Sequence, residues 1–138
     1  MKFKTLSGKE RGINIHNYII NWDNKSASNF QFNVKQFLKP YWQSQVVCEE
    51  FVLCGTRLRF DFFNITRNIV VEADGCAHTN FNRHFHNNSR ANYLAQIKRD
   101  LLKEKWCDIN KILMVHIYPD DVDDLCSEWF EEKYQISL

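Results

Sequence analysis

The stretch of sequence that decides the fold reads RLRFDFF (57–63), NITRN (64–68) and IVVEADGCAH (69–78). Two runs rich in β-forming residues flank a short polar loop, which is the pattern of a β-hairpin. The sequence therefore predicts two antiparallel strands joined by a turn at residues 64–68.

Acidic residues interrupt both of these apolar runs. Because side chains alternate between the two faces of a strand, Asp61 is expected on the face opposite to Phe60 and Phe62. In the second run, Glu72 and Asp74 are two residues apart and project together. Pairing of the strands around the loop would bring Asp61 near them, on the same side of the sheet.

Carboxylates that converge on one face repel each other unless they share a proton or a cation. Oxygen ligands of this kind suit Mg²⁺, which binds a few carboxylates and keeps several waters. Such an ion can orient a water nucleophile and neutralise charge on a phosphate under attack. The alternative is that the acids are ordinary solvent-facing strand residues. We favour the metal site, since Asp and Glu are poor strand formers.

The order of these motifs resembles that of the PD-(D/E)XK nuclease superfamily, in which an Asp in one strand precedes Glu-x-Lys in the next. More narrowly, the chain looks like the small single-domain endonucleases of that superfamily, which include the very-short-patch repair endonucleases and related phage homing endonucleases. The resemblance covers about residues 46–117. The matching positions are FDF (60–62), VEADG (71–75), His78, Gln96, Asp100 and Lys103.

The resemblance implies an α/β (α+β) fold with a restriction-endonuclease-like core, a central mixed sheet of about four strands flanked by helices. It implies a DNA endonuclease that depends on Mg²⁺ or Mn²⁺ and hydrolyses phosphodiester bonds with a metal-activated water. The metal ligands would be Asp61, Glu72 and Asp74. The catalytic residues would be these three together with His78, Gln96 and Lys103, with Asp100 as an additional candidate.

The chain departs from the family pattern at one position, because Asp74 stands where a Lys is typical. Lys103 or Lys98 on the following helix, or His78, would have to replace that lysine. Binding of the DNA backbone would fall to basic residues and histidines near the site. The candidates are Arg57, Arg59, Arg83, His84, His86, Arg90, Lys98 and Arg99.

The formal net charge of +1 does not by itself indicate a nucleic-acid binder. A DNA-binding enzyme of this composition needs its basic residues gathered on one face. The 138 residues are enough for one nuclease domain with a real core. Residues 1–25 form either a basic N-terminal arm that reaches for phosphates or a short element that closes one side of the core.

Periodicity predicts the remaining elements. Ser28 caps a helix in which Gln31 reciprocates, and Pro40 ends or kinks that helix. A first strand covers residues 46–53, and its Glu49 or Glu50 is either a fourth acidic member of the site or plain surface charge. A helix covers residues 89–107, with Leu94, Ile97 and Leu101 on one face and polar residues on the other. A strand over residues 111–118 pairs in parallel with residues 69–74 through a right-handed crossover, and a short last helix starts at Asp120.

Five cysteines without Cys-x-x-Cys spacing indicate reduced thiols. Cys48 and Cys54 are expected in the sheet as small apolar residues. A structural Zn²⁺ held by Cys76, His84, His86 and Cys107 is conceivable but not favoured, because the spacing is irregular. We find no signal peptide and no membrane-spanning segment, so a cytoplasmic protein is expected, as a monomer or homodimer.

Two other functions compete with the endonuclease. A non-catalytic nucleic-acid-binding module that kept the fold and lost the reaction would explain the missing strand lysine. A Holliday-junction resolvase would use the same chemistry, but it would require a dimer.

Overall fold

The computed structural model describes residues 1–75 and 90–138. Its main sheet has four strands in the order β3-β4-β5-β6. The first three strands are antiparallel neighbours, and β6 is parallel to β5. The strands are β3 (Val47–Val52), β4 (Arg59–Asn64), β5 (Ile69–Ala73) and β6 (Leu113–Ile117). The predicted hairpin, the first strand and the parallel crossover are thereby confirmed.

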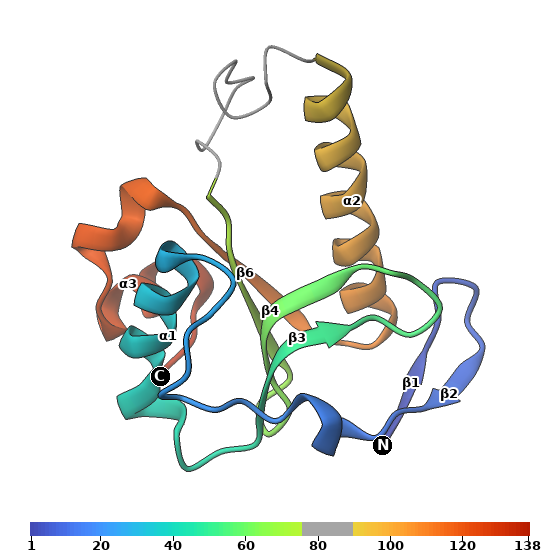
Figure 1. The fold of residues 1–138 in the computed structure, drawn as a ribbon, viewed down its shortest axis with the longest axis horizontal. Helices are drawn as coiled ribbons and strands as arrows, with labels where there is room; N and C mark the ends of the chain where they lie inside the picture. Colours follow the sequence, from blue (N-terminus) through green and yellow to red (C-terminus); the bar gives the residue numbers. More distant parts are fainter. Residues whose placement is uncertain (76–89) are drawn as a thin grey trace.

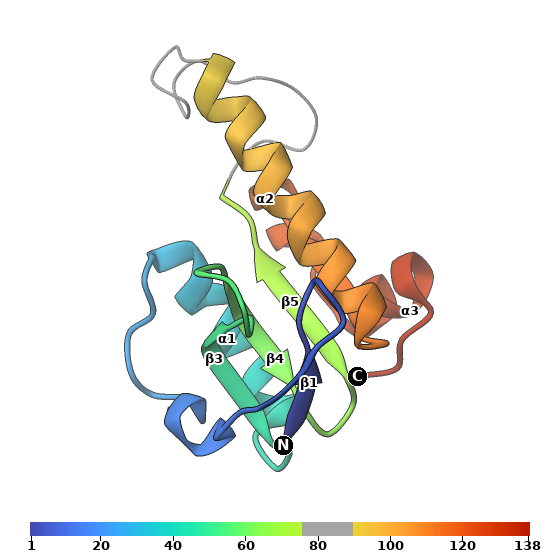
Figure 2. The same ribbon diagram turned by 90° about the vertical axis from the view of Figure 1, so that its right-hand side faces the viewer.

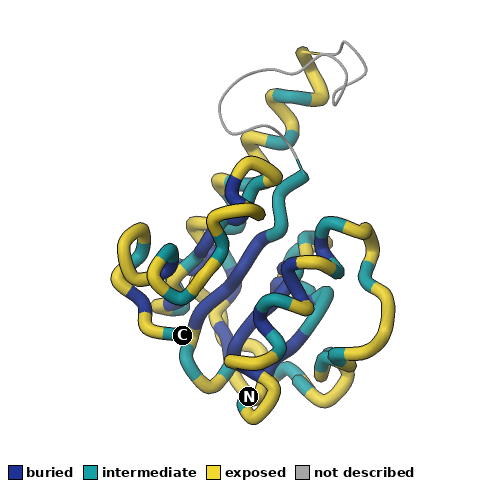
Figure 3. Tube along the Cα trace, turned by 90° about the vertical axis from the view of Figure 1, so that its left-hand side faces the viewer, coloured by how far each residue is buried: buried dark blue, intermediate teal, exposed yellow. Residues whose placement is uncertain are grey.

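Helices cover both faces of this sheet (Figure 1). The helix α1 (Asn29–Trp42) and the helix α3 (Ser127–Tyr134) lie on one face, and the helix α2 (Arg90–Ile109) lies on the other. Each face has its own apolar core. Figure 3 shows the buried strands between the two layers. The protein thus has a mixed α+β fold with a four-stranded mixed sheet, as the sequence predicted at this level.

The N-terminal residues form a small hairpin of β1 (Lys2–Lys4) and β2 (Glu10–Gly12), followed by the 3₁₀ helix η1 (Ile15–Tyr18). Phe3 anchors the hairpin, because its ring lies 5.5 Å from that of Phe51 and 5.5 Å from that of Trp106. Two hydrogen bonds between Lys4 and Asn110 tie the hairpin to the C-terminal end of α2. This segment therefore closes one side of the core, the second of the two arrangements expected for it (Figure 2).

The start of α1 is confirmed, since the Ser28 hydroxyl accepts the amide hydrogen of Gln31 at 3.1 Å. Of the two outcomes expected at Pro40, an end of the helix is wrong, because the helix continues through Pro40 to Trp42. Pro40 lies in the last turn of the helix, where its missing amide removes a single bond of the helical ladder. The Gln31 side chain does not reciprocate the cap but bonds Glu49 and Glu50.

Strict alternation along β4 was also a wrong prediction. Phe60 and Phe63 belong to the core on the α2 side, whereas Phe62 belongs to the core on the α1 side. Phe60 and Phe62 therefore lie on opposite faces although they are two residues apart. The phase of the strand changes at Asp61, between them.

After β6 the chain forms the 3₁₀ helix η2 (Pro119–Asp124) and then α3. The predicted helix start at Asp120 therefore corresponds to η2. The Asp121 carboxylate accepts the amide hydrogen of Tyr118 at 2.9 Å, which fixes the first turn. No helix within residues 1–75 and 90–138 has the length and hydropathy needed to cross a membrane.

Candidate active site

A pocket of about 290 Å³ lies on the α2 side of the sheet. Acidic and basic side chains from β4, β5, β6 and α2 surround it. Its lining residues are Asp61, Glu72, Ala73, Asp74, Gly75, Gln96, Arg99, Asp100, Lys103 and His116. The acids expected from the hairpin are thus brought together with the predicted polar positions of the following helix.

Two hydrogen bonds from backbone amides to carboxylates hold Asp61 beside Glu72 at the point where β4 and β5 separate. The backbone pairing of the two strands ends at Phe62 and Val71. Beyond it, the Asp61 amide donates to Glu72 Oε2 at 2.8 Å, and the Ala73 amide donates to Asp61 Oδ2 at 2.8 Å. At these two positions the backbone amides donate to side-chain carboxylates and not to backbone carbonyls of the neighbouring strand. These bonds fix the two acids side by side.

The Lys103 ammonium forms an ion pair with Glu72 Oε1. Glu72 is 5% exposed, so its charge is almost entirely removed from water. Burial alone would lower the pKa of Lys103, but the Glu72 carboxylate outweighs burial and raises that pKa above its ordinary value. Lys103 therefore remains a cation at neutral pH, which suits it for stabilising negative charge and not for accepting a proton.

Burial, together with the charge of Glu72, raises the pKa of Asp61 to about 9. Burial and the charge of Asp74 also raise the pKa of Asp100 above its ordinary value. The pocket therefore holds more carboxylate groups than its cations easily compensate. A positively charged ligand would relieve this repulsion.

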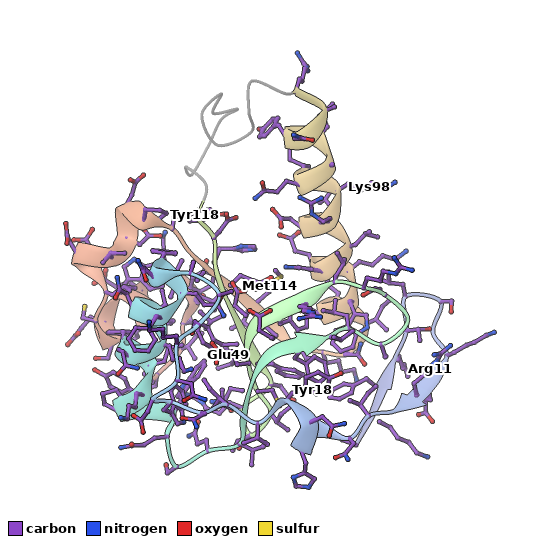
Figure 4. All side chains as sticks on the ribbon, in the orientation of Figure 1. Arg11, Tyr18, Glu49, Lys98, Met114 and Tyr118 are labelled. Atoms are coloured by element: carbon purple, nitrogen blue, oxygen red, sulfur yellow. The ribbon has the colours of Figure 1, made fainter. Side chains whose placement is uncertain are left out.

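Several predicted residues lie elsewhere. Lys98 is exposed and points away from the sheet (Figure 4), so Lys103 is the helix lysine that reaches the acidic pair. Of the basic residues proposed to bind DNA, Arg99 lines the pocket, whereas Arg57, Arg59 and Arg90 are exposed and do not. The remaining predicted positions lie outside the described residues: His78, Arg83, His84 and His86.

Glu50 does not line the pocket and is not a fourth acid of this cluster. Its Oε1 accepts a hydrogen bond from Gln31 of α1 at 3.0 Å. It also lies 4.0 Å from Arg59, in an exposed ion pair. The Glu50 backbone is left-handed, with φ of 55°.

His116 is a pocket residue that was not predicted from the sequence. It stands beside Glu72 in the parallel register of β5 and β6, and its Nε2 lies 3.7 Å from Glu104 Oε1. Its Nδ1 is buried and has no hydrogen-bond partner among the described residues. Superimposing the alternation of β6 on that of β5 would have indicated His116, because residues paired across two strands share a face.

The donor set fits a hard divalent cation. Within residues 1–75 and 90–138, no three His, Cys, Asp or Glu side chains are grouped closely enough to form a complete metal site. Mg²⁺ does not require one, because it is commonly held by one or two carboxylates together with waters and substrate phosphates. Asp61 and Glu72 provide such a pair, and Asp74 lines the same pocket.

The zinc site that was considered and not favoured falls mostly on positions outside the described residues. Its one described member, Cys107, is buried in the core on the α2 side. Cys48 and Cys54 are free and buried, as predicted.

Comparison with known proteins identifies no relative: no family model, no curated protein and no solved structure matches this chain.

Proposed function

We propose that this protein is a DNA endonuclease that depends on Mg²⁺ or Mn²⁺, with a restriction-endonuclease-like core. The observation that carries the proposal is the pair of Asp61 and Glu72. The amides of Asp61 and Ala73 hold the two acids side by side, and Lys103 flanks them. The four-stranded mixed sheet with helices on both faces agrees with what the resemblance to the PD-(D/E)XK nucleases implies.

Asp61 and Glu72 would hold the cation, with Asp74 as a further ligand. When bound, a divalent cation supplies Lewis-acid polarisation of a phosphate oxygen. The raised pKa of Asp61 supports this assignment, because a carboxyl that resists ionisation in the free protein is one that a cation would stabilise.

The other pocket residues act on the substrate directly. The Lys103 ammonium stabilises the negative charge that grows on the phosphate during attack, in the role that a strand lysine has in the related nucleases. The Gln96 amide, with its donor and acceptor atoms, orients the attacking water or a neighbouring phosphate oxygen. The Arg99 guanidinium, from the same face of α2, neutralises the DNA backbone beside the cut.

One observation favours a non-catalytic DNA-binding module instead. The ion pair between Lys103 and Glu72 already compensates one of the two acids without a metal. A lasting ion pair of this kind would make the cluster a structural feature of the fold. We prefer the enzyme because the pocket beside the pair leaves about 290 Å³ for a cation and a phosphate.

The two functions are separated by incubating the protein with supercoiled plasmid and Mg²⁺ or Mn²⁺. The test variant is Asp61→Asn/Glu72→Gln, which keeps side-chain volume and removes both carboxyl groups. The matched control is Asp108→Asn, an exposed acid on α2 outside the pocket. We expect the parent and the control to cut, and the double variant to lose at least about a hundredfold in rate.

If the parent protein leaves the plasmid intact but still binds it in a gel-shift assay, the result would contradict the endonuclease and favour the non-catalytic DNA-binding module. A four-way junction in the same assay tests the resolvase. Preferential cutting of the junction by a dimer would indicate that function.

A further inference from the structure

We infer that Glu50 positions the acidic pair: its left-handed backbone, held by Gln31, creates the change of phase in β3 and β4 that turns the Asp61 amide toward the Glu72 carboxylate. This inference deepens the proposed function and rests on it, because positioning the acids matters for catalysis only if the protein is a nuclease. The change of phase itself is a property of the sheet, and it can be tested whether or not the protein cuts DNA.

The change of phase affects both strands at the same level. Cys48 pairs with Phe63, and Phe51 pairs with Phe60. All four side chains lie in the core on the α2 side. In a regular strand, residues three positions apart point to opposite faces. Each strand must therefore leave regular β geometry once between its two core residues.

In β3, the departure occurs at Glu50. Its φ of 55° lies in the left-handed region, which is uncommon for any residue except glycine. The neighbouring pairs are Glu49 with Phe62 and Phe51 with Phe60, so Glu50 stands opposite Asp61. The other described non-glycine residues with positive φ lie between elements or at a helix end and not inside a strand: Asn68, Lys111 and Gln135.

A buried polar network on the α1 side holds this conformation. The buried Gln31 amide donates to Glu50 Oε1 at 3.0 Å and to Glu49 Oε2 at 3.2 Å. Glu49 also forms an ion pair with the fully buried Lys35 at 2.8 Å and accepts a hydrogen bond from Ser26. Gln31 thereby bonds two consecutive glutamates of β3. In a regular strand, consecutive side chains point to opposite faces of the sheet, so only one of the two would face α1. A strained backbone persists where its surroundings over-determine it in this way.

The consequence appears in the neighbouring strand. Asp61 stands opposite Glu72, one position beyond the pair of Phe62 and Val71. In a regular strand the Asp61 amide would point toward β3, as the Ile65 amide does in donating to the Val46 carbonyl, because alternate residues bond opposite neighbours. Here the amides of Asp61 and Ala73 bond carboxylate oxygens instead. The departure opposite Asp61 therefore turns the Asp61 amide from β3 to the Glu72 carboxylate, and this bond fixes the two acids relative to each other.

The test compares two substitutions at one position. Glu50→Gly keeps the left-handed backbone at no steric cost, whereas Glu50→Val disfavours it strongly. Amide hydrogen exchange, followed by NMR in the metal-free protein, reads the outcome at Asp61 and Ala73. We expect Glu50→Val to speed exchange at these two amides by about tenfold more than in the rest of β4 and β5, and Glu50→Gly to leave them protected.

Lys111→Val is the matched control, because it places the same strain at a left-handed residue outside the pocket. Its effect should spread over the sheet without singling out Asp61 and Ala73. If Glu50→Val does not fold, Glu50→Ala replaces it. Equal exchange in the Gly and Val variants, or a uniform effect of Val like that of the control, would overturn the inference and leave Glu50 as an irregularity of an edge strand.

Activity provides a second, separate measurement. We expect kcat of Glu50→Val to fall at least about tenfold below that of Glu50→Gly, with equal affinity for DNA measured in Ca²⁺. A parent protein without nuclease activity would overturn the proposed function, while the exchange experiment would still decide the inference about Glu50.

Discussion

The Lys103 ammonium forms an ion pair with one oxygen of Glu72, while the other oxygen of that carboxylate accepts the amide hydrogen of Asp61. One buried acid therefore joins α2 to β5 and β5 to β4. Its contribution to stability and its contribution to chemistry can be measured separately.

The first prediction is that Lys103→Met destabilises the protein by about 3 kcal/mol, because it leaves the charge of Glu72 buried without its cationic partner. Urea denaturation measures this free energy of unfolding. Lys103→Met/Glu72→Gln should recover most of the loss, since neither member then carries a charge. A cost below about 1 kcal/mol for the single change, typical of solvent-exposed pairs, would contradict the prediction.

The second prediction concerns pH. The pKa of Asp61 is raised from 3.8 to about 9 on folding. Between these values the folded state keeps a proton that the unfolded state releases, so raising the pH favours unfolding. Below pH 3.8 both states hold the proton, and above about pH 9 neither does. The stability of the metal-free parent relative to Asp61→Asn should therefore fall as the pH rises through this window.

Urea denaturation in EDTA at a series of pH values provides the measurement. The comparison with Asp61→Asn cancels the other titrating groups of the chain. Two curves that run parallel across the window would show that Asp61 does not titrate as expected.

The third prediction is that Mg²⁺ stabilises the folded protein. A ligand that binds only the folded state at about ten times its Kd adds about 1.4 kcal/mol. The gain should grow with pH, because the cation must displace the proton of Asp61. Thermal unfolding with and without Mg²⁺ measures it. Asp61→Asn/Glu72→Gln should show no gain, Asp108→Asn should show the full gain, and equal gains in all three proteins would indicate non-specific binding.

The fourth prediction compares two lysines on one face of α1. Lys35 is fully buried against Glu49, whereas Lys39 pairs with the exposed Asp23. Lys35→Met should lower the free energy of unfolding by about 3 kcal/mol, because it leaves the partly buried Glu49 carboxylate without its cation. Lys39→Met should cost less than about 1 kcal/mol. Similar costs in urea denaturation would contradict the view that burial distinguishes the two pairs.

The parts of this fold that local patterns specify were predictable from the sequence. A few neighbouring residues are enough to specify each of three features: the turn at residues 64–68, the cap at Ser28 and the apolar run of β6. The convergence of Asp61 and Glu72 follows from hairpin pairing alone. Lys103 was expected near them from the resemblance to the PD-(D/E)XK nucleases.

What was missed depends on contacts between distant segments. Glu50, whose backbone is left-handed, is bonded by Gln31 of α1, and no pattern within β3 indicates this contact. Strict alternation therefore placed Phe60 on the same face as Phe62, whereas the two side chains lie in different cores. His116 was missed for a related reason, since its relation to Glu72 exists only once the register of two parallel strands is known.

The orientation of α2 affects how this protein could be engineered. Its polar residues Gln96, Asp100 and Lys103 line the pocket, whereas Leu94, Ile97 and Leu101 are exposed, with Leu101 59% accessible. The upper half of the helix carries little buried surface (Figure 3). A redesign that followed hydropathy alone would turn the wrong side of this helix inward. Replacing these three aliphatic side chains by glutamine or lysine removes exposed hydrophobic surface and leaves the core unchanged. They are therefore the first positions to change for solubility or crystallisation.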